Sequence, residues 1–166
     1  PVNVSGITSA TSLASGMDHA CVLTGGTIKC WGLNTNGQLG DGTTTRHTTS
    51  VDVSGITTAT SIALGGLHSC ALLAGGTIKC WGGNDRGQLG DGTTTNRNTP
   101  VEVSGITTAT SLAPGYIHSC ALLTGGTTKC WGYNGNGELG DGTTTDSTTP
   151  VNVSGITSAT SLASGM

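Results

Sequence analysis

Charged and aromatic side chains are scarce in this sequence of 166 residues. Charged residues make up 9% of it, whereas soluble domains usually carry about 25%. It contains no Phe, three Trp and two Tyr. Only six residues are Lys or Arg, too few for the clustered positive charge that phosphate backbones require, so we expect no nucleic-acid partner. Because no run of 18 apolar residues occurs, we also expect no membrane insertion.

Motifs that carry out catalysis are also missing. Glu occurs only at Glu102 and Glu138, and the sequence has neither a G-x-S-x-G motif nor a phosphate-binding glycine loop followed by Lys. We therefore expect a non-enzymatic protein without a cofactor. The net charge is −3 and 31 residues are Thr, so solubility depends on hydroxyl groups. Such a low net charge favours association.

Repetition dominates the sequence, with a period of 50 residues. Trp31, Trp81 and Trp131 keep this spacing, as do neighbouring Cys and Asp residues. The repeats span residues 1–50, 51–100 and 101–149, and residues 150–166 begin a fourth repeat that is identical to residues 1–17. Residue 149 is thus followed by a second copy of the sequence that starts at residue 1, so the repeating unit is 149 residues long. This favours one period of a tandem array or fibre over a closed monomer.

The pattern within each repeat predicts β-structure. In the second repeat the candidate strands are residues 61–64, 68–73, 77–82 and 101–103, separated by Gly, Asn, Asp and Thr turns. Two of them, 68–73 and 77–82, are apolar on both faces. Strands buried on both faces and repeated at a fixed period indicate propeller blades or another stacked β-array.

The cysteines fix a strand register. With Cys70 opposite Cys80, a three-residue loop, residues 74–76, joins the two strands. The first repeat is one residue shorter there, and placing Cys21 opposite Cys30 leaves a two-residue Gly25-Gly26 turn that suits type I′. Because the loop absorbs the deletion and the cysteines still face each other, a Cys–Cys contact is supported in both repeats.

The tract H-x-C-A-L-L-x-G-G-T-x-K-C-W-G-x-N-x-x-G-x-L-G-D-G-T resembles the RCC1 repeat (regulator of chromosome condensation), in its two-cysteine bacterial form. The resemblance covers essentially the whole chain, three times over. It implies four-stranded blades, of which usually seven close a propeller. In the second repeat it is carried by His68, Cys70, Gly75, Gly76, Cys80, Trp81, Gly82, Asn84, Gly87, Leu89 and Gly90.

We therefore expect an all-β fold of tandem RCC1-like four-stranded β-propeller blades, with three full repeats and the first strand of a fourth. Three blades cannot close a propeller, because known propellers use about four to eight. Three arrangements remain open. The chain is a slice of a longer polypeptide, two chains pair to give six blades, or the repeats stack from chain to chain.

Each repeat carries a cysteine pair: Cys21–Cys30, Cys70–Cys80 and Cys120–Cys130. We expect disulfides, and hence an extracellular or cell-surface location. Buried reduced thiols are one alternative. A metal site is another, because His68 shares a strand face with Cys70 and Cys80, but it lacks a fourth ligand and the short Cys-x-x-Cys spacing of zinc sites. We expect no metal.

Three other sets of residues recur at the repeat spacing. We expect Trp31, Trp81 and Trp131 to pack in the blade core, rather than to form a stacking platform for a ligand. We expect His19, His68 and His118 to be structural and to bond a neighbouring loop backbone. Each Gly-Asp-Gly-Thr turn holds a single carboxylate (Asp41, Asp91, Asp141), which predicts turn formation and not a calcium site.

For function we expect first a secreted structural protein that associates with copies of itself, end to end, into an oligomer or filament. Residues 1–17 and 150–166 would be the joining segments, with Val2, Val4, Val151 and Val153 on the exposed strands.

The alternative is a fragment of a closed seven-bladed propeller that binds another protein at the cell surface. Its binding face would lie in the turns, where the repeats differ at Tyr116, Asp85-Arg86 and residues 45–47. A cytosolic regulator of GTPase exchange is a third class, which the cysteines disfavour.

Overall fold

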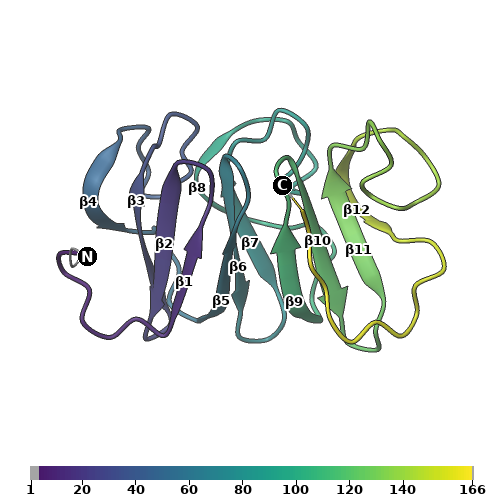
Figure 1. The fold of residues 1–166 in the computed structure, drawn as a ribbon, viewed down its shortest axis with the longest axis horizontal. Helices are drawn as coiled ribbons and strands as arrows, with labels where there is room; N and C mark the ends of the chain where they lie inside the picture. Colours follow the sequence, from purple (N-terminus) through teal and green to yellow (C-terminus); the bar gives the residue numbers. More distant parts are fainter. Residues whose placement is uncertain (1–3, 166) are drawn as a thin grey trace.

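The computed structural model describes residues 4–165 and arranges twelve strands in three antiparallel four-stranded sheets (Figure 1). The first sheet contains β1 (Ser12–Ser15), β2 (His19–Thr24), β3 (Thr27–Gly32) and β4 (His47–Asp52). The second contains β5 (Ala59–Leu64), β6 (His68–Leu73), β7 (Ile78–Gly82) and β8 (Arg97–Glu102). The third contains β9 (Ala109–Pro114), β10 (His118–Leu123), β11 (Thr128–Gly132) and β12 (Ser147–Asn152). The predicted all-β blades are confirmed, and none of the described residues lies in a helix that could cross a membrane.

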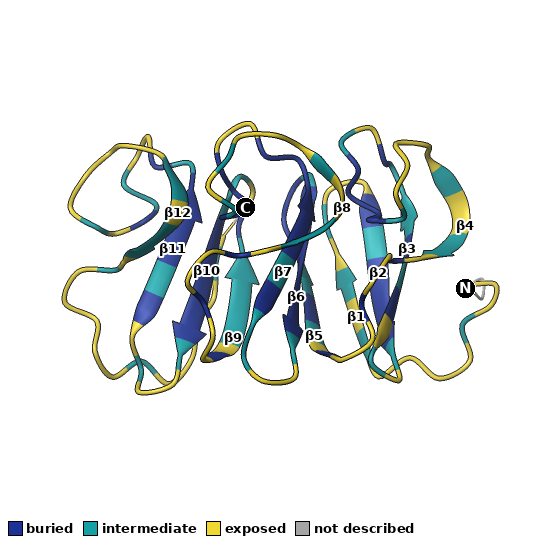
Figure 2. Ribbon diagram, turned by 180° about the vertical axis from the view of Figure 1, so that it is seen from behind, coloured by how far each residue is buried: buried dark blue, intermediate teal, exposed yellow. Residues whose placement is uncertain are grey.

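Within each blade the strands follow sequence order, and the middle two form its buried part (Figure 2). The first five residues of β6 are buried, as the apolar pattern on both faces predicts. The outer strands β4, β8 and β12 contain only partly buried and exposed residues. Their largely polar sequences therefore suit a strand with one side in solvent.

The predicted hairpin register is confirmed in both forms. Cys70 faces Cys80 and Cys21 faces Cys30. In the shorter hairpin Thr24 pairs with Thr27 across Gly25-Gly26. Gly25 and Gly26 both have positive φ, 56° and 86°, as a type I′ turn requires. The deleted residue is thus absorbed in the turn, and the strands remain in register.

The sheets divide the chain a few residues later than the repeats do. The third blade ends at Asn152, so residues 150–152 complete β12. Residues 153–165 then begin a fourth unit and lie on the third sheet as residues 53–64 lie on the first. Residues 159–164 correspond to β5 and β9, but no neighbouring strand is available to them among the described residues. For that reason they carry no strand hydrogen-bond ladder in the described chain.

Neighbouring blades share one hydrophobic core. Between the first and second blades, Leu39, Ile28 and the Cys21–Cys30 pair meet Ile62 and Trp81. The cluster between the second and third blades contains the equivalent residues, including Leu89, Ile78 and Trp131. Each blade therefore depends on the next to cover its apolar side, as in other repeat proteins.

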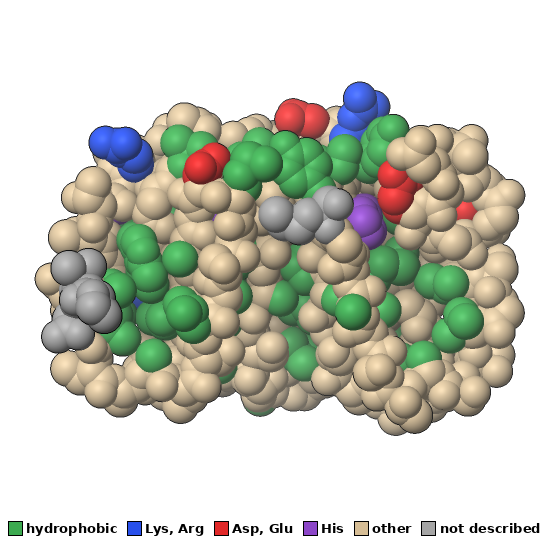
Figure 3. Space-filling model, in the orientation of Figure 1, with side chains coloured by type: hydrophobic (Ala, Val, Ile, Leu, Met, Phe, Trp, Pro, Cys, Tyr) green, Lys and Arg blue, Asp and Glu red, His purple; other side chains and the backbone are tan. Residues whose placement is uncertain are grey.

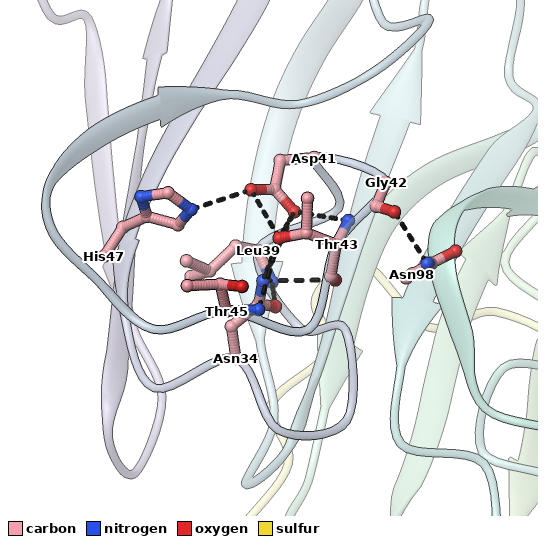
Figure 4. A network of polar contacts seen from close by, with 8 residues as sticks. All are labelled: Asn34, Leu39, Asp41, Gly42, Thr43, Thr45, His47 and Asn98. Carbon is pink, nitrogen blue, oxygen red and sulfur yellow. Dashed lines mark hydrogen bonds and ion pairs between the residues drawn. The ribbon is translucent and has the colours of Figure 1, made fainter.

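The long loop between β3 and β4 is held by one buried amide (Figure 4). Asn34 Oδ1 accepts from Leu39 N at 2.9 Å, and Asn34 Nδ2 donates to Asp41 Oδ1 and Thr43 O, both at 3.2 Å. Asp41 Oδ1 also accepts from Thr43 N at 2.9 Å. The predicted turn role of the aspartate is confirmed here.

The same carboxylate is held in its charged form. Partial burial raises the pKa of Asp41, but hydrogen bonds from Thr43 and Asn34 and the nearby His47 outweigh it, so the pKa lies below its ordinary value. A further bond, from Asn98 Nδ2 to Gly42 O at 2.8 Å, ties this loop to β8 of the second blade.

Candidate interaction surfaces at the two open blade faces

A main-chain carbonyl forms the centre of each joint between blades. Gln38 O accepts from Trp81 Nε1 at 3.0 Å and from Ser69 Oγ at 2.8 Å. Gln88 O accepts in the same way from Trp131 and Ser119, both at 2.9 Å. Each joint therefore connects the β3–β4 loop of one blade, or its equivalent, to the second and third strands of the next.

A histidine completes the network from the opposite side. His19 Nε2 lies 2.9 Å from Ser69 Oγ, and His68 Nε2 lies 2.8 Å from Ser119 Oγ. Because each serine hydroxyl donates to a glutamine carbonyl, it accepts from the ring, which assigns the proton to Nε2. The predicted partner was a loop backbone. The structure has instead a side-chain hydroxyl on the next blade.

These histidines are neutral. Burial, helped by the nearby His19 and His118, lowers the pKa of His68 to about 3. Burial lowers the pKa of His19 to about 4, although Asp18 opposes the shift. The Nδ1 atoms of His19 and His68 are buried without a partner, so a second proton would place an unsolvated charge in the joint.

Trp81 and Trp131 each pack against a glycine that no other residue can replace without a clash. A Cβ on Gly40 would lie 2.7 Å from Trp81 Nε1, and one on Gly90 would lie 2.8 Å from Trp131 Nε1. Both glycines also have φ of 70°, a conformation that disfavours other residues. Trp81 and Trp131 are fully buried, so these two predicted core residues lie in the core between blades.

The first blade leaves the tryptophan side of such a joint open. Trp31 occupies the same position as Trp81, but no blade precedes it among the described residues, and it is partly exposed. Leu13 is 67% exposed and Val4 39% exposed. A hollow of about 600 Å³ is lined by Trp31 together with Asp18, Leu33, Arg46 and His47. We call this surface the first face.

The third blade leaves the opposite side of the joint open. Glu138 and Gly140 stand where Gln38 and Gly40 stand in the first blade. They line a hollow of about 280 Å³ with Leu139, Val153 and Leu162. We call this surface the last face. His118 points toward it and bonds Ser164 Oγ at 2.8 Å, within the segment that begins the fourth unit.

The predicted self-association valines are placed unevenly. Val4 is exposed near the first face, Val153 is partly buried in the last face, and Val151 pairs with Cys130 in the third blade. Val2 lies outside the described residues. On the view in Figure 3, charged side chains gather mainly along the edge where the long loops lie, and the rest is largely uncharged.

The three cystines form as the register predicts, joining Cys21 to Cys30, Cys70 to Cys80 and Cys120 to Cys130. The sulfur atoms are therefore bonded to each other, and the histidine that shares their strand bonds a serine. Within residues 4–165 no group of three His, Cys, Asp or Glu is arranged to hold a metal ion.

Family models agree with this geometry. Two models match, each described as a Regulator of chromosome condensation (RCC1) repeat. The first matches residues 10–38 and 59–88. The second matches residues 26–72 and 76–122. The chain belongs to the RCC1 repeat family. No curated protein matches it.

Solved structures share the arrangement of blades. Yeast RCC1 (Prp20) bound to Kap60 is 22% identical, with a TM-score of 0.81 over 98% of this chain and 41% of that one. Human WBSCR16 is 21% identical, with a TM-score of 0.78 over 88% and 40% of the two chains. The chain thus spans about two fifths of the length of these two proteins. At this sequence identity the similarity establishes the fold alone.

Sequence reasoning missed the serines and the carbonyl of each RCC1 joint. Ser69 and Ser119 recur in the tract H-S-C, which was a usable signal for a polar contact beside the cysteine. Gln38 O gave no signal, because any residue supplies a main-chain carbonyl.

Proposed function

We propose that this RCC1 repeat chain is a non-enzymatic interaction protein that binds copies of itself end to end. The last face of one copy receives the first face of the next. Trp31 enters the slot beside Gly140 and donates to the carbonyl of Glu138. This reproduces, between two chains, the joint that the chain builds twice within itself.

One observation carries the proposal: the two open faces are the two halves of one joint. The first face has an indole and a partly exposed apolar surface without a blade against it. The last face has the glycine and the carbonyl without an indole. A Cβ on Gly90 meets both Trp131 and Val103, so Val153 borders the equivalent slot beside Gly140.

The three cystines support a location in an oxidising compartment, and we propose that the chain works outside the cell. Few charges and many hydroxyls suit a surface that contacts copies of itself. The reducing cytosol would open the three disulfides that cross-link this small core.

Two variants test the face-to-face contact. Trp31→Ala removes the indole of the first face, and Val153→Arg places a charge in the slot of the last face. In sedimentation velocity we expect the wild-type chain to associate with rising concentration and each variant alone to remain a monomer. An equal mixture of the two should form dimers only, because one intact pair of faces remains.

The exposed Thr44→Ala serves as the matched control and should associate like wild type. A wild-type chain that stays monomeric at all concentrations would overturn the proposal. So would a mixture that stays monomeric although both variants keep the wild-type circular dichroism spectrum.

A second candidate is a binding module within a closed RCC1 propeller of a longer chain. The observation that favours it is the coverage of about two fifths of solved RCC1 structures. In that case further blades cover both faces, and the variable turns bind the partner. Binding of a different protein that survives Trp31→Ala and is lost when Tyr116 is replaced would favour this candidate.

A further inference from the structure

We infer that copies join by strand exchange: residues 157–165 of one copy replace residues 8–16 of the next and pair with its β2. The inference rests on the proposed end-to-end contact and specifies how it is made. The resulting blade at the seam contains one strand from the first chain and three strands from the second.

The first step is that an internal segment makes two sets of contacts. Residues 53–64 pack on the first blade through Val53, Ile56 and Ile62, which are 3–5% exposed. The same segment also pairs as β5 with β6 of the second blade. Residues 103–114 do the same between the second and third blades.

Each terminal segment makes only one of these sets, although their sequences are identical. The N-terminal segment pairs as β1 with β2, but its apolar side is uncovered, since Leu13 is 67% exposed. The C-terminal segment packs on the last face, where Val153 and Leu162 contact the cluster of Cys120, Cys130 and Leu139, but it has no strand partner within residues 4–165. One segment serving both blades would make both sets.

The C-terminal segment already has the geometry of an internal one. Val153 N donates to Thr128 O at 3.0 Å, Ser154 N to Gly140 O at 2.8 Å and Ala159 N to Gly126 O at 2.9 Å. The equivalent three bonds attach residues 53–59 to the first blade, each at 2.9 Å. Exchange keeps these bonds, and the identical residues of the C-terminal segment re-form the ladder that β1 gives up on β2.

The terminal repeat also differs from the others at one cross-strand pair. In the internal blades Leu64 faces Ser69 and Pro114 faces Ser119, and each serine bonds the histidine of the preceding blade. In the first blade Ser15 faces Ala20 instead. The hydroxyl has therefore moved from the second strand to the first.

This change fits a seam. When the first blade of one copy meets the third blade of another, Ala20 cannot bond His118. Ser164, the counterpart of Ser15, already lies 2.8 Å from His118 Nε2. The histidine at the seam thus keeps a hydroxyl partner, and that partner belongs to the segment that stays on the last face.

Because the two segments are identical, the same substitution can be made in each. Gly16 N donates to His19 O, and antiparallel ladders alternate, so the Ala14 N–H also points at β2. Proline removes this donor. We expect Ala163→Pro to weaken association at least about ten-fold, and Ala14→Pro, its matched control, to leave association equal to or stronger than wild type.

The reverse pattern, with Ala14→Pro weakened and Ala163→Pro equal or stronger, would overturn exchange and leave the face-to-face contact in place. Equal behaviour of both variants would overturn exchange too. If wild type itself does not associate, the proposed function fails, which is a separate result.

A second measurement does not depend on how the Ala14→Pro chain folds. A synthetic peptide of residues 153–165 in excess over the full chain should occupy β2 and reduce the sedimentation coefficient of preformed assemblies toward that of the monomer. The same peptide carrying the Ala163→Pro change should have no effect. Assemblies unaffected by either peptide would contradict exchange.

Discussion

Neutral histidines and serine hydroxyls connect the blades at the level of single residues. The ring of His68 donates to Ser119, which donates to Gln88 O. The chain of donors has one direction only, because the last acceptor is a carbonyl. Protonation of the buried Nδ1 adds a charge without a partner, so the joint is stable only while the ring is neutral.

A pH dependence follows from these rings. Burial holds the pKa of His68 at about 3 against 6.5 when unfolded, so the unfolded chain binds more protons between these values. The free energy of unfolding should therefore be highest above pH 6.5 and fall as the pH drops, by up to about 1.4 kcal/mol per pH unit for each such histidine. Urea unfolding between pH 7 and pH 4.5 measures this slope.

His68→Gln keeps a donor toward Ser119 and removes the titrating group. Its slope should be shallower than that of wild type over the same range. An unchanged slope would contradict the assignment of the pH dependence to this joint.

The sequence predicted that these histidines are structural, but the partner it predicted, a loop backbone, is wrong for His19 and His68. Their spacing places them beside the cysteines, and a strand register can be derived from that. The partner lies one blade away, and its position depends on how two sheets pack. Asn34 shows the same limit, since its amide contacts Asp41 and Thr43 only after the loop has folded.

At the level of elements, the hairpin between the second and third strands of each blade is the best-determined part. Its two strands are apolar on both faces, and its turn contains glycines with positive φ. The cystine cross-links it at a buried position, with Cys70 and Cys80 both at 0% exposure. This element could therefore be predicted from sequence to the level of residue pairs.

Removal of this cross-link tests its contribution. The Cys70–Cys80 bond closes a loop with a sequence separation of 10, which corresponds to about 2.5–3 kcal/mol in the chain-entropy account. The double variant Cys70→Ala with Cys80→Ala should lose about this much in urea unfolding under non-reducing conditions. Wild type in excess reductant should lose more, because all three cystines open, and equal stability of the two samples would contradict this account.

The fourth strand of each blade was harder to predict. Only residues 101–103 were assigned in the second repeat, whereas β8 runs from Arg97 to Glu102. Its sequence, R-N-T-P-V-E, lacks an apolar alternation, and it forms a strand because β7 offers an unpaired edge. Residues 159–164 show the converse, since a suitable sequence without such an edge forms no ladder.

For the whole molecule, the three blades follow the curvature of an RCC1 propeller, with a TM-score of 0.81 over 98% of the chain. End-to-end contacts of this kind form rings when the rotation closes and filaments when it does not. The usual RCC1 propeller has seven blades, and copies of three blades cannot add up to seven.

If the joint between copies keeps the curvature of a seven-bladed propeller, two copies leave a gap and three overlap, so we expect the associated wild-type chain to form open filaments and not a six-bladed ring of two copies. Negative-stain electron microscopy of the assembled protein at neutral pH should show them, and the Val153→Arg variant should show none. Uniform closed discs would contradict this, and discs of six blades would indicate a ring of two copies.

The central acceptor of each joint, Gln38 O or Gln88 O, belongs to the main chain, and its partner slot is a glycine. No joint thus depends on a side chain that is unique to one neighbour. Recombination between near-identical repeats can add or remove an internal unit of 50 residues while each remaining joint keeps its contact between carbonyl and indole. The length of such an array is then a property that can vary between generations without any blade being redesigned.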